Sequence, residues 1–199
     1  MLLFSLKKVF LVVFLVSFSL VNTAIVKSSQ EKSSEEIHVM PPIDETQEGL
    51  RNQVVSDYIR ARGNLNSGTL EHLLQSIAHE AHYFIDTHGT GGWNGNPSSN
   101  DPRVIGTVKH HYAKDLLEGL MKKHGQLPGK IKIECDYGHG GSFAAKADVA
   151  LEDGEVLYFY DYKFGESGFN NQRRRQIKDS ITKRRNPKFT DVRIIEIRG

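Results

Sequence analysis

The chain has 199 residues, enough for one ordinary domain with additional segments, and it carries 26 basic and 24 acidic residues. Cys135 is the only cysteine, which excludes an intrachain disulfide and a multi-cysteine zinc site. Because the charges nearly balance, any attraction to nucleic acid must come from local patches rather than from net charge.

Residues 1–24 predict a secretory signal peptide. Lys7 and Lys8 precede an apolar run, and small residues follow at Thr23 and Ala24, which is the order that signal peptides have. The alternative is an uncleaved membrane anchor, which the polar residues within the run disfavour. Cleavage would remove two of the 26 basic residues and none of the 24 acidic ones. We therefore expect a secreted or periplasmic protein without net charge and without stable membrane association.

Two segments follow this region. Residues 25–47 are rich in Ser, Glu, Lys and Pro, lack periodic apolar positions and predict a disordered linker. Residues 48–103 predict a helical extension that ends in a glycine-rich loop. The firmest helix of this extension is expected to be capped by Ser67 or Thr69 and to continue to Phe84.

Residues 104–199 predict a single domain. The spacing of apolar residues indicates, in order, a helix over 105–123, strands over 131–135, 143–151 and 156–163, a helix over 170–181 and a strand over 192–195. Hairpin-linked strands followed by a helix and a further strand imply a mixed sheet flanked by helices, in the α/β (α+β) class.

The two middle strands are expected to form a hairpin. Asp153-Gly154 is a hairpin-turn signal, and a turn centred on it places Asp148 near Phe159. Asp148 then lies diagonal to Asp161, within about 7–8 Å. The alternation of side chains also predicts one shared face for Phe143, Ala145, Ala147, Val149 and Leu151.

Two carboxylates and an ammonium would meet at the end of this hairpin. Asp161 and Lys163 point to the same face of their strand because side chains alternate. Asp148 and Asp161 could hold a divalent metal ion, and Lys163 could lie beside a phosphate or an attacking water. The alternative is an exposed strand edge at which Lys163 neutralises Asp161. Glu134, on the preceding strand, is a third candidate metal ligand or else a solvent-facing residue.

The helix over 170–181 is strongly basic. Its side chains could bind phosphates independently of base sequence, or they could form a solvated helix face. The candidate nucleic-acid-binding residues are Arg173, Arg174, Arg175, Gln176 and Lys178.

The helix that ends near Phe84 offers a second candidate site. His72, His79 and His82 fall roughly on one face, and the segment from His79 to His82 is one residue short of the H-E-x-x-H zinc motif. A secreted zinc hydrolase is therefore an alternative hypothesis, beside packing or surface roles for these histidines.

Two motifs resemble a known family. Asp148 together with Tyr160-Asp161-Tyr162-Lys163-Phe164-Gly165 resembles the PD-(D/E)XK nuclease superfamily. The segment from Ile105 to Ala113 resembles a helix of the restriction-endonuclease-fold toxin domains of bacterial polymorphic toxins. The resemblance covers residues 104–199 and implies a restriction-endonuclease-like αβββαβ core.

The same resemblance implies roles for individual residues. Asp148 and Asp161 would bind Mg²⁺ or Mn²⁺, and Lys163 would position or activate the water. The chain departs from the family in two places, because Ala147 replaces a proline and His110 stands where many members have a helix glutamate. His110 is therefore a candidate catalytic residue whose role, like the number of metal ions, is left open.

The expected function is that of an exported, metal-dependent nuclease that hydrolyses phosphodiester bonds, with DNA favoured over RNA. The resemblance implies a toxin or effector with a neutralising immunity protein. A secreted scavenging nuclease is an equal alternative, and a non-catalytic nucleic-acid-binding module of the same fold is another.

Overall fold

The structure, a computed structural model, describes residues 45–92, 98–137, 145–183 and 188–199. All of these residues belong to one compact unit of the chain. The expected signal peptide and nearly all of the expected linker lie outside the described residues. Within the part of the chain that is described, no helix is both long and apolar enough to cross a membrane.

Three helices precede the sheet. α2 (Glu45–Gly63) begins inside the expected linker, and α3 (Ser67–His88) and α4 (Pro102–His124) follow it. A single 3-10 turn, η1 (Thr90–Gly92), comes directly after α3. The predicted helical extension therefore consists of two long helices that pack against each other and against α4.

Asn66 caps α3, rather than Ser67 or Thr69. The Asn66 side chain accepts a hydrogen bond from Thr69 N at 3.0 Å, and the Thr69 hydroxyl accepts one from Asn66 N at 3.0 Å. This reciprocal pair is a capping box, which satisfies two backbone N–H groups at once. Thr69 takes part in the cap, but as its third helical residue.

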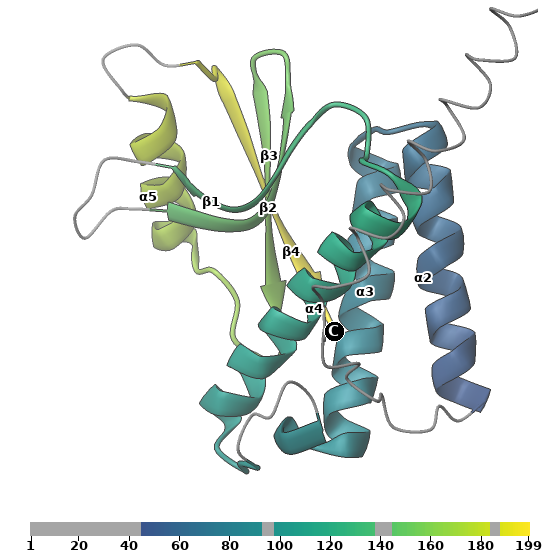
Figure 1. Cartoon of the computed structure of the whole chain (residues 1–199). Helices are drawn as coiled ribbons and strands as arrows, with labels where there is room; N and C mark the ends of the chain where they lie inside the picture. Colours follow the sequence, from purple (N-terminus) through teal and green to yellow (C-terminus); the bar gives the residue numbers. More distant parts are fainter. Residues whose placement is uncertain (1–44, 93–97, 138–144, 184–187) are drawn as a thin grey trace, which may run out of the picture. The chain divides into compact units, whose positions relative to one another are not determined.

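The four strands form one mixed sheet in the order β1-β2-β3-β4 (Figure 1). β1 (Lys130–Tyr137), β2 (Ala145–Asp153) and β3 (Val156–Lys163) are consecutive antiparallel neighbours. The chain then passes through α5 (Asn171–Thr182) and returns as β4 (Asp191–Arg198), which is parallel to β3. This order of elements and the mixed sheet flanked by helices confirm the prediction at that level.

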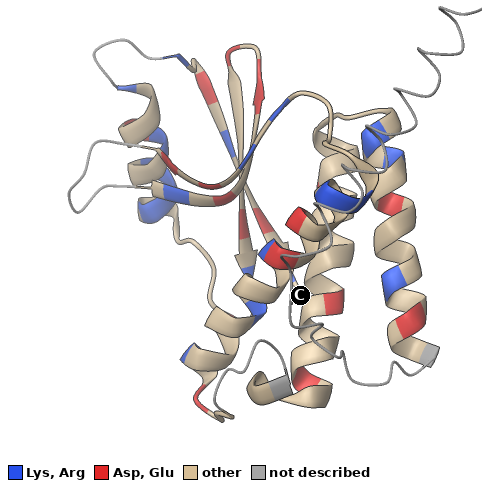
Figure 2. Cartoon of the chain, in the orientation of Figure 1, with Lys and Arg blue, Asp and Glu red and all other residues tan. Residues whose placement is uncertain are grey.

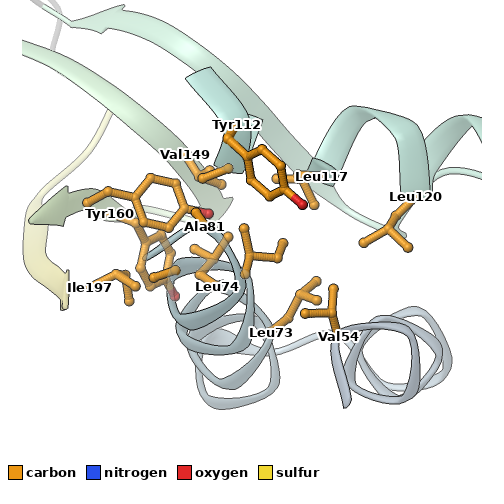
Figure 3. Close-up of a cluster of buried hydrophobic side chains, with 14 of the residues drawn as sticks. Val54, Leu73, Leu74, Ala81, Tyr112, Leu117, Leu120, Val149, Tyr160 and Ile197 are labelled. Atoms are coloured by element: carbon orange, nitrogen blue, oxygen red, sulfur yellow. The ribbon is translucent and has the colours of Figure 1, made fainter. Parts of the chain in front are cut away.

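Helices cover both faces of the sheet (Figure 1). On one side, called here the α4 face, α3 and α4 cover the sheet, and α2 packs against these two helices. Figure 3 shows part of this larger core, which includes Val54, Leu74, Tyr112, Leu117, Val149 and Tyr160. On the other side, the α5 face, a smaller core contains Ala147, Leu157, Phe159, Ile177 and Ile181.

The turn between β2 and β3 lies one residue further along the chain than predicted. Asp153 pairs with Val156, so the two-residue loop is Gly154-Glu155. Gly154 takes a left-handed φ of 57°, which glycine adopts without steric cost. The displaced turn shifts the pairing by two residues, and the predicted position of Asp148 near Phe159 was therefore wrong. A shift of two residues keeps every side chain on its predicted face.

The prediction that one face of β2 continues from Ala145 to Leu151 was also wrong. Ala145 and Ala147 pack into the core on the α5 face, whereas Val149 and Leu151 pack into the core on the α4 face. Regular alternation would place all four on one side. The strand therefore changes face at Asp148, between Ala147 and Val149.

β1 changes face at the same level. Ile131 and Ile133 pack towards the α4 face, whereas Cys135 and Tyr137 pack towards the α5 face. Glu134 lies between them with a left-handed φ of 48°, which is an uncommon conformation for a residue with a side chain. Such local irregularities in a strand pair re-aim the neighbouring side chains.

Candidate functional site

The β2–β3 ladder ends next to two aspartates. Its last pair is Val149 with Tyr160, and Asp148 and Asp161 are the next residues in that register. Instead of a ladder bond, Asp148 Oδ2 accepts a hydrogen bond from Tyr162 N at 2.7 Å. The two strands therefore part at this level, and the Asp148 carboxylate takes up the space between them.

α4 brings His110 to the same carboxylate. His110 Nδ1 lies 3.3 Å from Asp148 Oδ2. The imidazole stands edge-on to the rings of Tyr162 and Phe164, with centroids 6.1 and 5.2 Å away. With Nδ1 turned to Asp148, Nε2 is the ring nitrogen left for a ligand. The side chain of His110 remains 34% exposed, so a ligand can reach it.

Asp161 and Lys163 form an ion pair at the end of β3. Their side chains are only 13% and 19% exposed, respectively. Burial raises the pKa of Asp161; the Lys163 ammonium opposes this rise, and the nearby charge of Asp148 adds to it. Asp161 Oδ2 is buried and accepts no well-oriented hydrogen bond from the described residues. The Lys163 ammonium is the group that contacts this oxygen, and it is a hydrogen-bond donor to the carboxylate.

The ammonium of Lys163 rests on an aromatic ring. Lys163 Nζ lies 4.0 Å from the ring centroid of Phe169, in the segment between β3 and α5. Phe169 N donates to Glu196 Oε1 at 2.8 Å, and Arg174 Nε donates to Phe169 O at 3.4 Å. Arg174 and Glu196 also pair with each other at 2.5 Å. We call Phe169, Arg174 and Glu196 the clamp, because they fix the ring beneath the ammonium.

The clamp is tightly packed around Glu196. A Cβ atom at Gly168 would lie 2.5 Å from Glu196 Oε2, so only glycine fits there without rearrangement. Burial alone would raise the pKa of Glu196, but the Phe169 hydrogen bond and the charges of Arg174 and Arg198 hold that pKa below its ordinary value. Glu196 is thus an ionised, almost buried carboxylate whose partners are Phe169 before α5, Arg174 of α5 and Arg198 of β4.

Glu134 is not directed at the aspartate pair. Its carboxylate pairs with Lys114 Nζ at 2.6 Å and with Lys146 Nζ at 3.1 Å. The Lys114 hydrogen bond, followed by that of Lys146, lowers the pKa of Glu134. These two lysines neutralise the third predicted metal ligand, and they hold the irregular turn of β1 in place.

Two carboxylates are the donor set that the site offers to a metal ion. Within the described ranges, no three His, Cys, Asp or Glu side chains are grouped so as to hold one. Mg²⁺ commonly uses one or two protein carboxylates and completes its shell with water and substrate phosphate. The carboxylate of Asp161, whose Oδ2 is buried and in contact with only the Lys163 ammonium among the described residues, fits such an ion. The residues therefore fit Mg²⁺ or Mn²⁺ completed by substrate, and they do not fit an all-protein metal cage.

Two grooves flank the segment between β3 and α5. The α4 groove has a volume of about 550 Å³ and is lined by Arg103, Gly106, Thr107, His110, Lys163 and Phe164, among others. The α5 groove measures about 420 Å³ and is lined by Phe169, Asn170, Gln172, Arg173 and Gln176, with Gly168. The α4 groove therefore opens onto the end of β3, and the α5 groove opens onto the residues that lead into α5.

The predicted nucleic-acid-binding residues of α5 divide into separate groups. Arg173 and Gln176 line the α5 groove. Arg175 and Lys178 line a third groove of about 560 Å³ beside β4. Arg174 also reaches this third groove, but its guanidinium is committed to the clamp and to the backbone oxygen of Ile194 at 3.0 Å.

The three histidines of α3 that were predicted as a zinc site are not gathered into a site. His72 and His79 are exposed, and His79 Nε2 lies 2.9 Å from Gln75 Nε2. His82 Nε2 lies 2.9 Å from Asp86 Oδ2, and the other oxygen of this carboxylate, Oδ1, pairs with the buried Lys109 at 2.6 Å. Among the described residues, this arrangement gives no three-ligand set for the predicted zinc alternative.

The clamp was missed by sequence reasoning. Phe169 and Glu196 are 27 residues apart and belong to no motif. Their sequence signals were an aromatic residue before a helix cap and a lone acid in an apolar strand, and neither signal specifies a partner. Gly106 did carry a signal, since it interrupts a helical pattern.

Comparison with protein-family models, with curated proteins and with solved structures finds no match to this chain.

Proposed function

We propose that this chain is a divalent-metal-dependent nuclease with a restriction-endonuclease-like core, and that it hydrolyses phosphodiester bonds of nucleic acid, with DNA favoured. One observation carries the proposal. Where β2 and β3 part, the carboxylates of Asp148 and Asp161 are joined by the ammonium of Lys163 and the imidazole of His110. Few other chemistries need two carboxylates, a buried cation and an imidazole at one open strand end.

Asp148 and Asp161 would hold Mg²⁺ or Mn²⁺. When bound, such an ion polarises a phosphate and lowers the pKa of a water molecule. Lys163 would donate to the phosphate from a half-buried position in contact with the Asp161 carboxylate and the Phe169 ring. His110 has Nδ1 fixed by Asp148 and could accept or deliver a proton at Nε2.

The basic side chains of α5 would hold the nucleic-acid backbone (Figure 2). Arg175 and Lys178 are exposed, line the groove beside β4 and have no ion pair among the described residues. Such cations contact phosphates without reading base sequence. Export remains a proposal that rests on the signal-peptide pattern of residues 1–24. A toxin role and a neutralising immunity protein remain proposals that rest on the sequence resemblance.

The test is cleavage by the purified protein of plasmid DNA and of RNA, with Mg²⁺, with Mn²⁺ or with EDTA. We expect cleavage that requires the cation and that falls by about 100-fold or more in Asp161→Asn and in Lys163→Ala. Asp153→Asn is the matched control, because it removes an exposed carboxylate at the far end of the same hairpin and should retain activity.

Two results would overturn the proposal. One is metal-dependent cleavage that survives both Asp161→Asn and Lys163→Ala. The other is the absence of cleavage of every nucleic acid and with every divalent cation, although circular dichroism shows that the protein is folded.

A further inference from the structure

Gly106 stands in the interior of α4, where glycine weakens a helix relative to alanine. Packing does not require it there. A Cβ atom added at Gly106 meets no heavy atom within 4 Å, and Gly106 is absent from the glycines with a left-handed φ. Neither close contact nor backbone conformation therefore explains why this helix carries a glycine at position 106.

The open side of Gly106 faces the α4 groove. Arg103 and His110 lie three residues before it and four after it, so the three share one helix face, and all of them line that groove. Lys163 and Phe164 line the groove from the end of β3. A side chain at position 106 would therefore project into the approach to His110 and Lys163.

The α4 groove suits an anionic ligand. Arg103 and Lys163 supply two cations, of which Lys163 pairs with Asp161 outside the lining. Glu166 is the only acidic residue of the lining. The Arg103 side chain is 92% exposed, although it pairs with Asp101, so a stronger anion can recruit it. A volume of about 550 Å³ falls within the range of small-molecule sites.

We propose that the α4 groove seats the phosphodiester strand next to the reacting phosphate, and that Gly106 keeps this groove open for it. This inference rests on the proposed nuclease function and deepens it, because it states where the substrate strand lies. Gly106 is in this view a residue that admits substrate and takes no part in the chemistry.

Gly119 provides a matched control. It lies in the same helix, is exposed, and also has no heavy atom within 4 Å of an added Cβ, but it does not line the α4 groove. Alanine at either position should raise the midpoint of thermal unfolding by about 2–4 °C, because both sites gain helix propensity.

The two positions should differ in substrate binding. Binding of a short fluorescent oligonucleotide, followed by anisotropy in EDTA at low salt, should weaken by about tenfold or more in Gly106→Gln. The same measurement should be unchanged in Gly119→Gln. In cleavage assays, Gly106→Ala should raise KM more than it lowers kcat.

The outcomes test the groove proposal and the nuclease proposal separately. Equal binding by Gly106→Gln and Gly119→Gln overturns the groove proposal, as does a lower unfolding midpoint for Gly106→Ala than for the wild type. Binding that depends on Gly106 without any cleavage overturns the nuclease proposal and leaves the groove in place as an anion site. A wild-type protein that neither binds nor cleaves overturns both.

Discussion

Asp161 is the residue at which stability and chemistry oppose each other. Its buried carboxylate has a raised pKa and an oxygen without a well-oriented donor. Because folding favours the protonated form of Asp161, the folded state loses stability relative to the unfolded state as Asp161 ionises. The ionised form that a metal ion would need is thus the form that the fold alone disfavours.

This opposition predicts a pH dependence of stability. In EDTA, the free energy of unfolding of the wild type, relative to Asp161→Asn, should fall as pH rises from 3.8, the ordinary value, through the raised pKa of the folded protein. The folded state binds the proton more tightly than the unfolded state does in this window, and each unit of difference is worth about 1.4 kcal/mol. Urea unfolding at successive pH values measures it.

The same titration with Mg²⁺ present is the control. A bound cation favours the ionised carboxylate and stabilises the folded state by mass action, so the fall with pH should shrink or reverse. Parallel curves for the wild type and Asp161→Asn, with and without Mg²⁺, would show that this carboxylate neither titrates abnormally nor binds the ion.

At the scale of elements, the segment between β3 and α5 positions Lys163 through the clamp. Phe169→Leu keeps an apolar side chain but removes the ring face below Nζ. A cation–π contact is worth about 0.5–2 kcal/mol. We therefore expect kcat to fall by about 3- to 30-fold in Phe169→Leu, with KM nearly unchanged and with activity retained in Phe169→Tyr.

A spectroscopic readout separates this role from a general loss of structure. The side-chain protons of Lys163 near the ring should carry a ring-current shift in NMR spectra, which disappears in Phe169→Leu and persists in Phe169→Tyr. If Leu and Tyr give the same kcat and the same Lys163 shifts, the ring does not position the ammonium.

The elements themselves could be predicted from the sequence, but their exact register could not. Periodic apolar residues identify each strand and helix of 104–199, because burial imposes that period. Asp153-Gly154 identifies a hairpin, yet it does not say whether Asp153 is the last strand residue or the first loop residue. In the structure, Asp153 is the last strand residue, because it pairs with Val156.

The change of face in β1 and β2 has no sequence signature of its own. Ile131, Ile133 and Cys135 alternate as they would in a regular strand, although Ile133 and Cys135 pack on opposite sides of the sheet. The backbone of Glu134 makes the difference, and its left-handed φ depends on partners far along the chain. The spacing could predict Asp148, Asp161 and Lys163 as a group, but it could not predict the clamp.

At the scale of the whole molecule, the cationic side chains of α5 should divide into residues that bind phosphate and residues that stabilise the fold. Arg175 and Lys178 face a groove without an ion pair among the described residues, whereas Arg174 is held in the clamp. If the first two neutralise phosphates, Arg175→Ala and Lys178→Ala should each reduce the slope of log affinity against log salt by about 0.9 for duplex DNA.

Arg174→Ala is the contrasting variant. It should lower the free energy of unfolding by about 1–3 kcal/mol, because Glu196 loses one of its two arginine partners and the oxygens of Phe169 and Ile194 lose their donor. Thermal unfolding and salt titrations on the same proteins compare the two classes. Identical behaviour of Arg174→Ala and Arg175→Ala in both measurements would contradict this division.

The hydrogen bond from Tyr162 N to Asp148 Oδ2 means that one side chain serves both the candidate site and the sheet. The Asp148 carboxylate accepts a hydrogen bond from β3 that a main-chain carbonyl of β2 would accept in a continued ladder. A substitution of Asp148 by a residue without an acceptor would remove a candidate metal ligand. It would also leave the backbone N–H of Tyr162 without its acceptor. A lineage that no longer needed the activity would therefore still be under pressure to retain an acceptor at position 148, so an intact Asp148 by itself is no proof of a working enzyme.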